Sequence, residues 1–291
     1  TMPVKLKGGP ILATLLIISL FGTACERAAD DAASVRQPAD AALTESAGPA
    51  SSTVEVPVLK RPVDAETLPY ADVNEALVYG HFAFPSDMIE PLPAIILIHD
   101  WWGVNDDIRT AANRLASEGF MVLAIDLYSG ETATTAQEAR QKTIRVLENQ
   151  DDVAENIRQA IMFVEAVEAP AIGVVGWGFG GGWSLEGALL FPAEIEAAVI
   201  YYGQVNHDEE RLQVLKAPVL GLFGRNDRRI EVQSVRDFED ALQRLRKPAD
   251  IKVYADAGHS FADPSHRNFD AVVAEDAWAR MLDFFTLHLA D

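Results

Sequence analysis

The sequence predicts an α/β domain with a mainly parallel central sheet and helices on both of its faces. Short, continuous apolar runs of strand length recur along the chain, for example at 93–99 and 120–126. Amphipathic stretches with helical spacing lie between these runs. A run that is apolar throughout indicates a strand covered on both faces, and strands that alternate with helices pair in parallel. The 291 residues, about half of them hydrophobic, are enough for one sizeable core and a tail.

The elements of this domain follow one another in a regular order. Alternation from Val73 to Phe84 predicts an edge strand or a hairpin. The buried strand at 93–99 comes next, and Asn105 or Asp106 is placed to cap the helix behind it. The remaining predicted elements are a strand at 120–126, helices at 136–148 and 151–168, a strand at 171–176 with a helix to about 190, strands at 197–202, 218–223 and 251–254, a helix at 231–246 and a closing helix that reaches Leu289.

The first part of the chain has the features of a bacterial secretion signal. Two lysines precede an apolar stretch at 11–21, which is shorter than the ~20 residues that a membrane-spanning helix needs. Small residues then lead into Cys25 and resemble a lipobox, although Gly22 stands where leucine is usual. We therefore expect a secretion signal over 1–24 and a lipid on Cys25 that anchors the protein to a membrane in the periplasm or cell envelope. An ordinary secreted protein and an uncleaved anchor are the alternatives.

The composition separates a tail from a folded domain. Residues 25–70 are rich in Ala, Asp, Ser, Thr and Pro, so we expect a flexible tether ahead of a domain that spans 71–291. Cys25 is the only cysteine, which leaves that domain without a thiol nucleophile, a disulfide or a cysteine-based metal site. The formal net charge of −20 argues against nucleic acid as a partner. No motif requires a cofactor or a metal, so neither is expected.

The stretch 171–183 is the centre of the predicted site. Its apolar strand ends in Gly176-Trp177-Gly178-Phe179-Gly180, and a helical pattern follows. A corner of this kind needs glycine, because a Cβ clashes where φ turns positive or where two backbones approach closely. Ligands of parallel sheets bind at the carboxyl ends of the strands. The loops that follow residues 99, 176, 223 and 254 are therefore expected to converge on one site.

Two of these loops carry an acid and a histidine. Asp227 follows the predicted strand at 218–223, and His259 follows the strand at 251–254. A strand-to-helix corner, then an acid, then a histidine resembles the catalytic order of α/β-hydrolases. In that order the acid fixes the histidine tautomer and stabilises its protonated form, while the histidine moves the proton. Taken one at a time, a turn-capping aspartate and a surface histidine would explain the same residues.

Four motifs make the domain resemble the dienelactone hydrolase family over nearly all of residues 71–291. They are His99-Asp100-Trp101-Trp102-Gly103-Val104-Asn105-Asp106, Ala124-Ile125-Asp126-Leu127-Tyr128, the corner from Gly176 to Ser184, and Gly258-His259-Ser260-Phe261. The resemblance implies the α/β-hydrolase fold and an enzyme that hydrolyses a small ester or lactone without a cofactor.

The resemblance also gives each matching position a role. The nucleophilic cysteine of the family falls on Gly178, its acid on Asp227 and its histidine on His259. A family glutamate that interacts with the resting thiol falls on Asp100, which is one methylene shorter.

The oxyanion hole implied by the resemblance would use the backbone N–H groups of Trp101 and Phe179, which do not depend on any side chain. Trp102 and Trp177, close to these two residues in sequence, would wall a pocket for a neutral or aromatic ligand. Packing of these aromatic rings in the core is the alternative.

Three departures separate this chain from the family. Gly178 carries no thiol or hydroxyl, so no acyl-enzyme can form there. Neither Ser184 nor Ser260 is expected to reach the corner in its place. Two arginines hold the substrate carboxylate in the namesake enzymes, and the corresponding positions here are Asp263 and Gly130. An anionic dienelactone is therefore not the expected substrate.

Two functions remain for such a site. In the first, the protein is a hydrolase with weak or altered chemistry, in which His259, oriented by Asp227, activates a water molecule above Gly178. In the second, it is a catalytically inactive small-molecule-binding protein on a hydrolase scaffold.

Two other readings of the motifs are weaker. Residues 176–181 fit the dinucleotide fingerprint G-x-G-x-x-G, but that fingerprint normally lies in the first βαβ unit, and no acid ends the next strand. The six histidines show no H-E-x-x-H spacing, which argues against a metal hydrolase. His99 is expected to orient its own loop.

Overall fold

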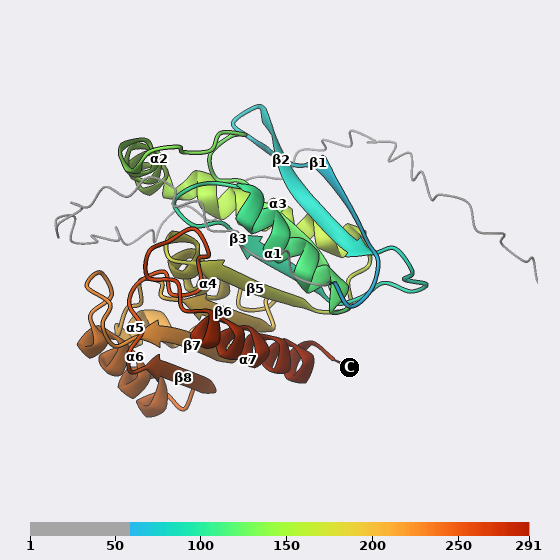
Figure 1. Cartoon of the computed structure of the whole chain (residues 1–291). Coiled ribbons are helices and arrows are strands. Elements are labelled where there is room, and N and C mark those ends of the chain that lie inside the picture. The colour runs from blue at the N-terminus through green and yellow to red at the C-terminus, as the bar shows by residue number, and fades with distance from the viewer. Residues whose placement is uncertain (1–58, 291) are drawn as a thin grey trace, which may run out of the picture. The chain divides into compact units, whose positions relative to one another are not determined.

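The computed structural model describes residues 59–290, where strands and helices alternate as predicted (Figure 1). The strands are β1 (Val63–Val73), β2 (Ala76–Pro85), β3 (Ala94–Ile98), β4 (Met121–Ile125), β5 (Ile172–Trp177), β6 (Ala197–Tyr201), β7 (Val219–Gly224) and β8 (Ala249–Tyr254). The helices are α1 (Asp106–Ser117), α2 (Ala136–Glu148), α3 (Gln150–Ala166), α4 (Phe179–Leu190), α5 (Glu209–Leu212), α6 (Val232–Arg244) and α7 (Ala271–Leu289).

The strands of this part of the chain form one sheet in the order β1-β2-β4-β3-β5-β6-β7-β8. The β1–β2 and β2–β4 pairs are antiparallel, and all the other neighbouring pairs are parallel. Every residue of β3 to β7 is buried, because helices cover both faces of this part of the sheet. The predicted α/β-hydrolase architecture is therefore confirmed.

The sheet begins with a hairpin that the sequence predicted only in part. Its turn residues, Asn74 and Glu75, have φ values of 54° and 64°, which suit the right-handed twist of paired strands. β1 starts at Val63, so the predicted boundary between tether and domain at residue 70 is wrong. The sequence pattern did not predict the start of β1, because this strand lies at the edge of the sheet and is mostly exposed. Backbone pairing with β2, rather than apolar side chains, holds it in place. The predicted signal over 1–24 and the lipidation site at Cys25 lie outside the described residues.

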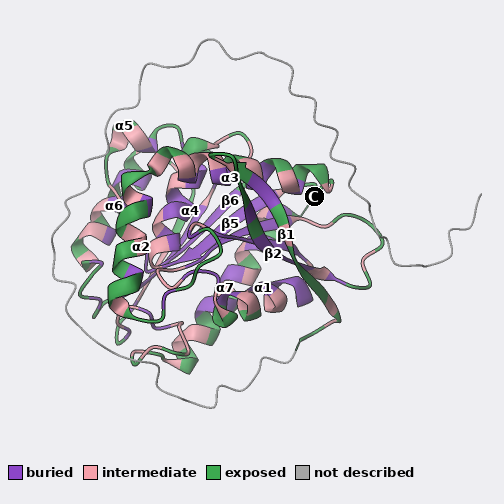
Figure 2. Cartoon of the chain, turned by 90° about the horizontal axis from the view of Figure 1, so that it is seen from above, coloured by how far each residue is buried: buried purple, intermediate pink, exposed green. Residues whose placement is uncertain are grey.

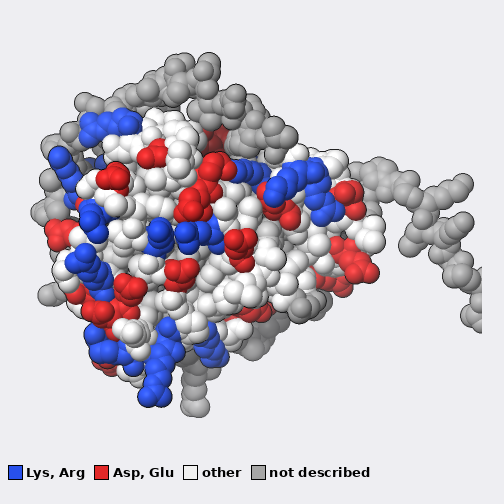
Figure 3. Space-filling view, turned by 60° about the horizontal axis from the view of Figure 1, so that its bottom comes forward, with Lys and Arg blue, Asp and Glu red and all other residues white. Residues whose placement is uncertain are grey.

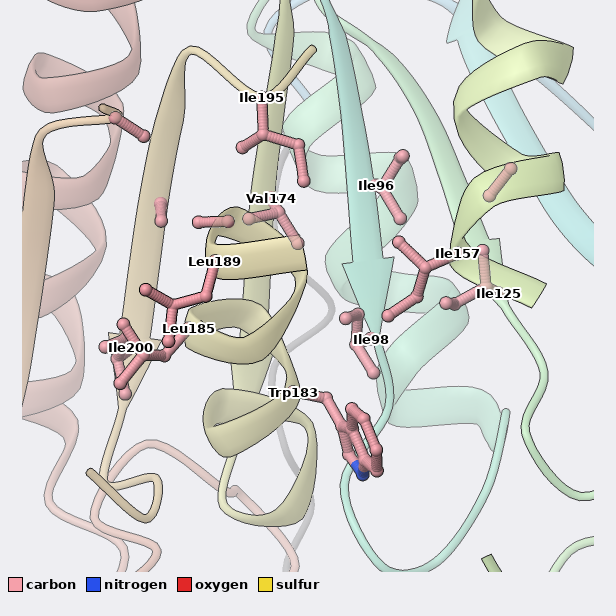
Figure 4. Close-up of a cluster of buried hydrophobic side chains, with 14 of the residues drawn as sticks. Ile96, Ile98, Ile125, Ile157, Val174, Trp183, Leu185, Leu189, Ile195 and Ile200 are labelled. Carbon is pink, nitrogen blue, oxygen red and sulfur yellow. The ribbon is translucent and has the colours of Figure 1, made fainter. Parts of the chain in front are cut away.

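Two hydrophobic clusters cover the two faces of the sheet. Helices α3, α4 and α6 belong to one cluster, and α1 and α7 belong to the other. Figure 2 shows the buried strands between these two groups of helices. Each large aliphatic side chain removed from water in this way contributes about 1.5–3 kcal/mol. The side chains labelled in Figure 4 are part of the first cluster and come from strands, helices and the connection between α4 and β6: Ile96, Ile98, Ile125, Ile157, Val174, Trp183, Leu185, Leu189, Ile195 and Ile200.

The parallel strands place their carboxyl ends along one edge of the sheet, where the predicted site residues follow β3, β5, β7 and β8. The loop after β3 is closed by Asn105, whose side-chain oxygen accepts a hydrogen bond of 3.1 Å from the backbone N–H of Ile108. Of the two cap candidates for α1, Asn105 is therefore the one that caps it.

The surface of the described residues mixes both signs of charge. Acidic and basic side chains are interspersed over the face drawn in Figure 3. None of the helices within residues 59–290 has the length and apolar character needed to cross a membrane.

Candidate functional site

The corner between β5 and α4 is built on glycine. Gly178 has φ of 52° and ψ of −109°, a conformation that side-chain-bearing residues rarely adopt. A Cβ added at Gly180 would lie 2.2 Å from the carbonyl oxygen of Ile98, so only glycine lets the first turn of α4 pack against the end of β3. The corner thus presses the start of α4 against the loop that carries Asp100.

A small space lies at the Cβ position of Gly178. A Cβ built there would be 3.8 Å from Nε2 of His259, 3.9 Å from Cδ2 of Tyr202 and 4.0 Å from Cβ of Asp100. These are ordinary van der Waals distances, and all three neighbours are side chains. We call this space the Gly178 notch.

Asp227 and His259 lie together beside the notch. Nδ1 of His259 is 2.8 Å from Oδ2 of Asp227, and the other carboxylate oxygen accepts hydrogen bonds from the backbone N–H groups of Arg229 (2.7 Å) and Ile230 (3.0 Å). The carboxylate is almost completely buried. Because an ionised carboxylate only accepts, Nδ1 carries the proton and Nε2 is left as the acceptor that borders the notch. This is the arrangement a general base requires.

Asp100 is the second acid–base group at the notch. Its Oδ1 accepts a hydrogen bond of 2.8 Å from the backbone N–H of Trp102. Burial raises the pKa of the Asp100 carboxyl from 3.8 to about 8. The negative charges of Asp263 and Asp107 act in the same direction, and the Trp102 N–H and Arg229 oppose them. Asp100 is therefore mostly protonated at pH 7.

His99 joins two loops of the site rather than facing the notch. Its Nδ1 donates to the carbonyl oxygen of Asp100 (2.5 Å), and its Nε2 accepts from the backbone N–H of Leu127 (3.0 Å). Burial lowers the pKa of His99, so the ring is neutral and both nitrogens are used. The expectation that His99 orients its loop is confirmed.

The aromatic residues divide between the site and the core. Trp101 and Trp102 are half-buried, with ring centroids 4.8 Å apart, and the Arg229 guanidinium lies 4.9 Å from the Trp101 ring centroid. Trp177 is buried on the α1/α7 face and stacks on Tyr201 at 5.1 Å. Trp177 therefore packs in the core on this face of the sheet, and a role for it in a pocket wall stays a prediction.

The expected oxyanion donors occupy neighbouring segments. Trp101 directly follows Asp100, and Phe179 is the first residue of α4 after Gly178. The packing of Gly180 against the carbonyl groups of Ile98 and His99 brings these two segments together. Binding of an oxyanion by the N–H groups of Trp101 and Phe179 stays a prediction.

The two serines near the corner do not take the place of a nucleophile. Ser184 is fully buried in α4, and its hydroxyl donates to the carbonyl oxygen of Gly180 at 3.1 Å. Ser260 is buried at a φ of 60° directly after His259.

Asp263 and Gly130, which stand where the resemblance implies substrate-binding arginines, have different surroundings in the structure. Asp263 lies close enough to Asp100 to raise the pKa of that carboxyl. The backbone N–H of Gly130 donates to the carboxylate of Asp126, so this position serves the loop after β4.

Sequence reasoning missed Tyr202, which forms one wall of the notch. Its ring packs edge-on against His259 at 5.2 Å, and the residue has a φ of 37° directly after β6. Its hydroxyl is buried and has no hydrogen-bond partner among the described residues. Its position at the carboxyl end of the strand next to the corner could have marked Tyr202 as a site residue in the sequence.

The geometry also bears on the dinucleotide and metal readings. The strand β5 that precedes α4 follows β3 and β4 in the chain, so the glycine corner does not lie in the first βαβ unit, where the dinucleotide fingerprint normally lies. Within residues 59–290, His, Asp and Glu side chains nowhere gather in a group of three or more that could hold a metal ion.

Comparisons with known proteins agree on one family. The model of the dienelactone hydrolase family matches residues 78–289. An Escherichia coli (strain K12) protein with a provisional carboxymethylenebutenolidase name is 29% identical over 267 residues, which cover 84% of this chain and 96% of that protein.

Solved structures show the same fold. A Klebsiella pneumoniae protein provisionally named a dienelactone hydrolase aligns with a TM-score of 0.71 and 24% identity over 78% of this chain and 100% of its own. A dienelactone hydrolase-like promiscuous phosphotriesterase from metagenomic libraries aligns with a TM-score of 0.71 and 22% identity, over 78% of this chain and 98% of its own.

Proposed function

Because the chain belongs to the dienelactone hydrolase family, we propose that it hydrolyses a small ester or lactone by direct attack of water rather than through an acyl-enzyme. The observation that carries this proposal is the Gly178 notch, whose Cβ position lies 3.8 Å from Nε2 of His259. Gly178 marks the place of the nucleophile in this proposal. A water molecule that occupies the notch would then lie within hydrogen-bond reach of the imidazole.

In the proposed reaction His259 takes the proton of the water as its oxygen attacks the carbonyl carbon of the substrate. Asp227, held by two backbone N–H groups, stabilises the imidazolium that forms. The N–H groups of Trp101 and Phe179 are proposed to stabilise the oxyanion of the tetrahedral intermediate. Without a covalent step, catalysis should be weak, because sites that lack the nucleophile keep roughly 10³–10⁴-fold of rate enhancement over water.

The substrate is proposed to be neutral. Asp263 and the turn glycine Gly130 stand where anchoring arginines would hold a carboxylate, and Asp263 adds negative charge near Asp100. Trp101 and Trp102 supply half-buried aromatic surface on the same loop.

The assay of this proposal uses the purified full chain with short-chain aryl esters and small lactones. We expect slow turnover above the rate in buffer. Ser184→Ala and Ser260→Ala are expected to keep that rate within about 2-fold if they remain folded, because neither hydroxyl is used. Specific binding of these esters without turnover would instead support the alternative, an inactive small-molecule-binding protein. Loss of turnover in a folded serine variant would assign the chemistry to that hydroxyl.

We also propose that the protein is exported and anchored to a membrane of the cell envelope by a lipid on Cys25. The support is the signal pattern over 1–24, which ends in small residues before the cysteine. Mass spectrometry of the mature N-terminal peptide should find a lipid-modified Cys25, and Cys25→Ala should release the protein from the membrane fraction. An unmodified N-terminus at another residue would contradict the lipid anchor.

A further inference from the structure

Two acid–base groups border the same notch. Nε2 of His259 is 3.8 Å and Cβ of Asp100 is 4.0 Å from the Cβ position of Gly178. They come from the loops after β8 and β3, so they approach the notch from different strands. His259 is committed through Nδ1 to Asp227, and Oδ1 of Asp100 is committed to the N–H of Trp102. A proton on Asp100 therefore belongs on Oδ2, because Oδ1 already accepts a hydrogen bond.

The surroundings of Asp100 keep that proton in place. Burial has the largest effect, and Asp263 from the loop after β8 and Asp107 from α1 add negative charge. The positive charge of Arg229, from the loop after β7, acts in the opposite direction and lowers the pKa of this carboxyl. Burial raises the pKa of the Tyr128 and Tyr202 hydroxyls, and a negative charge on Asp100 would raise both further. Both hydroxyls are therefore neutral.

We propose that Asp100 is the proton donor of the site, which protonates the leaving oxygen of the substrate while His259 serves only as the base. This inference rests on the proposed water route. His259 accepts a proton from water as the new C–O bond forms. The tetrahedral intermediate then breaks its bond to the leaving oxygen, which takes the proton from Oδ2 of Asp100. The imidazolium of His259 finally returns a proton to the Asp100 carboxylate through water, so the net reaction is ester plus water to acid plus alcohol.

The leaving group provides the sharpest test. An alkoxide needs a proton as it leaves, whereas 4-nitrophenoxide does not. Asp100→Asn is isosteric and permanently neutral but cannot donate a proton as an acid. We expect it to slow hydrolysis of an alkyl ester by roughly 10²-fold and hydrolysis of the matching 4-nitrophenyl ester by less than about 3-fold. An equal loss on both esters would overturn the proposal.

The pH profile on the alkyl ester gives a second test. Activity should fall as pH rises through about 8, because Asp100 then loses its proton. Asp263→Asn removes a negative charge and should move this limb to lower pH. Arg229→Gln removes a positive charge and should move it to higher pH. Asp256→Asn, on the exposed part of the loop after β8, is the control and should leave the limb where it is. If the pH at which activity falls is unchanged in both Asp263→Asn and Arg229→Gln, the role of Asp100 as proton donor is contradicted.

A measurement without substrate separates this inference from the proposed function. The folded-state pKa of Asp100 lies above its ordinary value of 3.8, so the unfolded chain loses this proton first and stability falls as pH rises from about 4 to about 8. The unfolding free energy of Asp100→Asn lacks this pH-dependent fall. The unfolding free energy of the variant minus that of the natural protein should therefore increase from about pH 4 to about pH 8 and stay constant above pH 8. If the protein hydrolyses esters but the pH-dependent stability difference is missing, the proton-donor role of Asp100 is contradicted and the proposed function is not. If the stability difference is present but no ester is hydrolysed, the proposed function is contradicted, and the donor role with it.

Discussion

Gly178→Cys is expected to raise the rate of aryl-ester hydrolysis by at least about 10²-fold and to produce an acyl-enzyme. The Cβ of the new side chain would lie 3.8 Å from Nε2 of His259, which places its thiol within reach of the imidazole. No backbone atom is among the nearest neighbours of that Cβ, so there is space for it, and the cost of the substitution comes from the positive φ. The variant is best made together with Cys25→Ala, so that the introduced thiol is the only one in the chain.

The matched control for this gain is Gly178→Ala. Both substitutions place a Cβ at a φ of 52°, which costs on the order of 1–3 kcal/mol of stability, so both should lower the melting temperature by a similar amount. Alanine brings no nucleophile and fills part of the notch, so it should abolish the water route. Stopped-flow kinetics and intact-mass spectrometry decide the outcome. A folded Gly178→Cys protein that gains neither rate nor adduct would show that the corner does not face the histidine.

His259→Ala is expected to lower the hydrolysis rate by roughly 10²–10⁴-fold. The reason is that Nε2 is the proposed base at the notch, while Asp227 binds Nδ1 at 2.8 Å and so orients the ring. Asp227→Asn should cause a loss of similar kind, because an amide cannot stabilise the imidazolium. The two substitutions combined should cost little more than either one alone, since the pair acts as a unit. Values of kcat/KM for the three variants measure this directly.

His288→Ala provides the control for the removal of an imidazole. His288 lies in the last turn of α7, where its ring packs on Phe284. Its replacement by alanine should leave kcat/KM within about 2-fold of the value for the natural protein. Retention of full activity in His259→Ala would remove the histidine from the reaction. Strict additivity of His259→Ala and Asp227→Asn would show that the hydrogen bond between them does not matter for catalysis.

The strands of the sheet could be predicted wherever both faces are covered. β3 to β7 are buried at every residue, and such burial demands a continuous apolar run that is visible in the sequence. β1 could not be predicted in this way, because an exposed edge strand carries polar residues and depends on pairing with β2. The one-turn helix α5 was missed because Glu209–Leu212 is too short for any periodic signal.

The site could be predicted in outline from strand ends and chain order. Asp227 and His259 were found because each follows a strand that the sequence predicted, and the structure joins them by a hydrogen bond of 2.8 Å. Tyr202 was not found, because an aromatic residue at the end of a buried strand reads as core, and its contact with the notch depends on the turn at its positive φ.

The pre-steady-state time course of the natural protein with a 4-nitrophenyl ester tests the central claim most directly. If water attacks the substrate in the Gly178 notch without a covalent intermediate, product should accumulate linearly from the first turnover, and the line should extrapolate to zero at zero time. An initial burst of 4-nitrophenol equal to the enzyme concentration, matched by an acylated protein in the mass spectrum, would contradict the account.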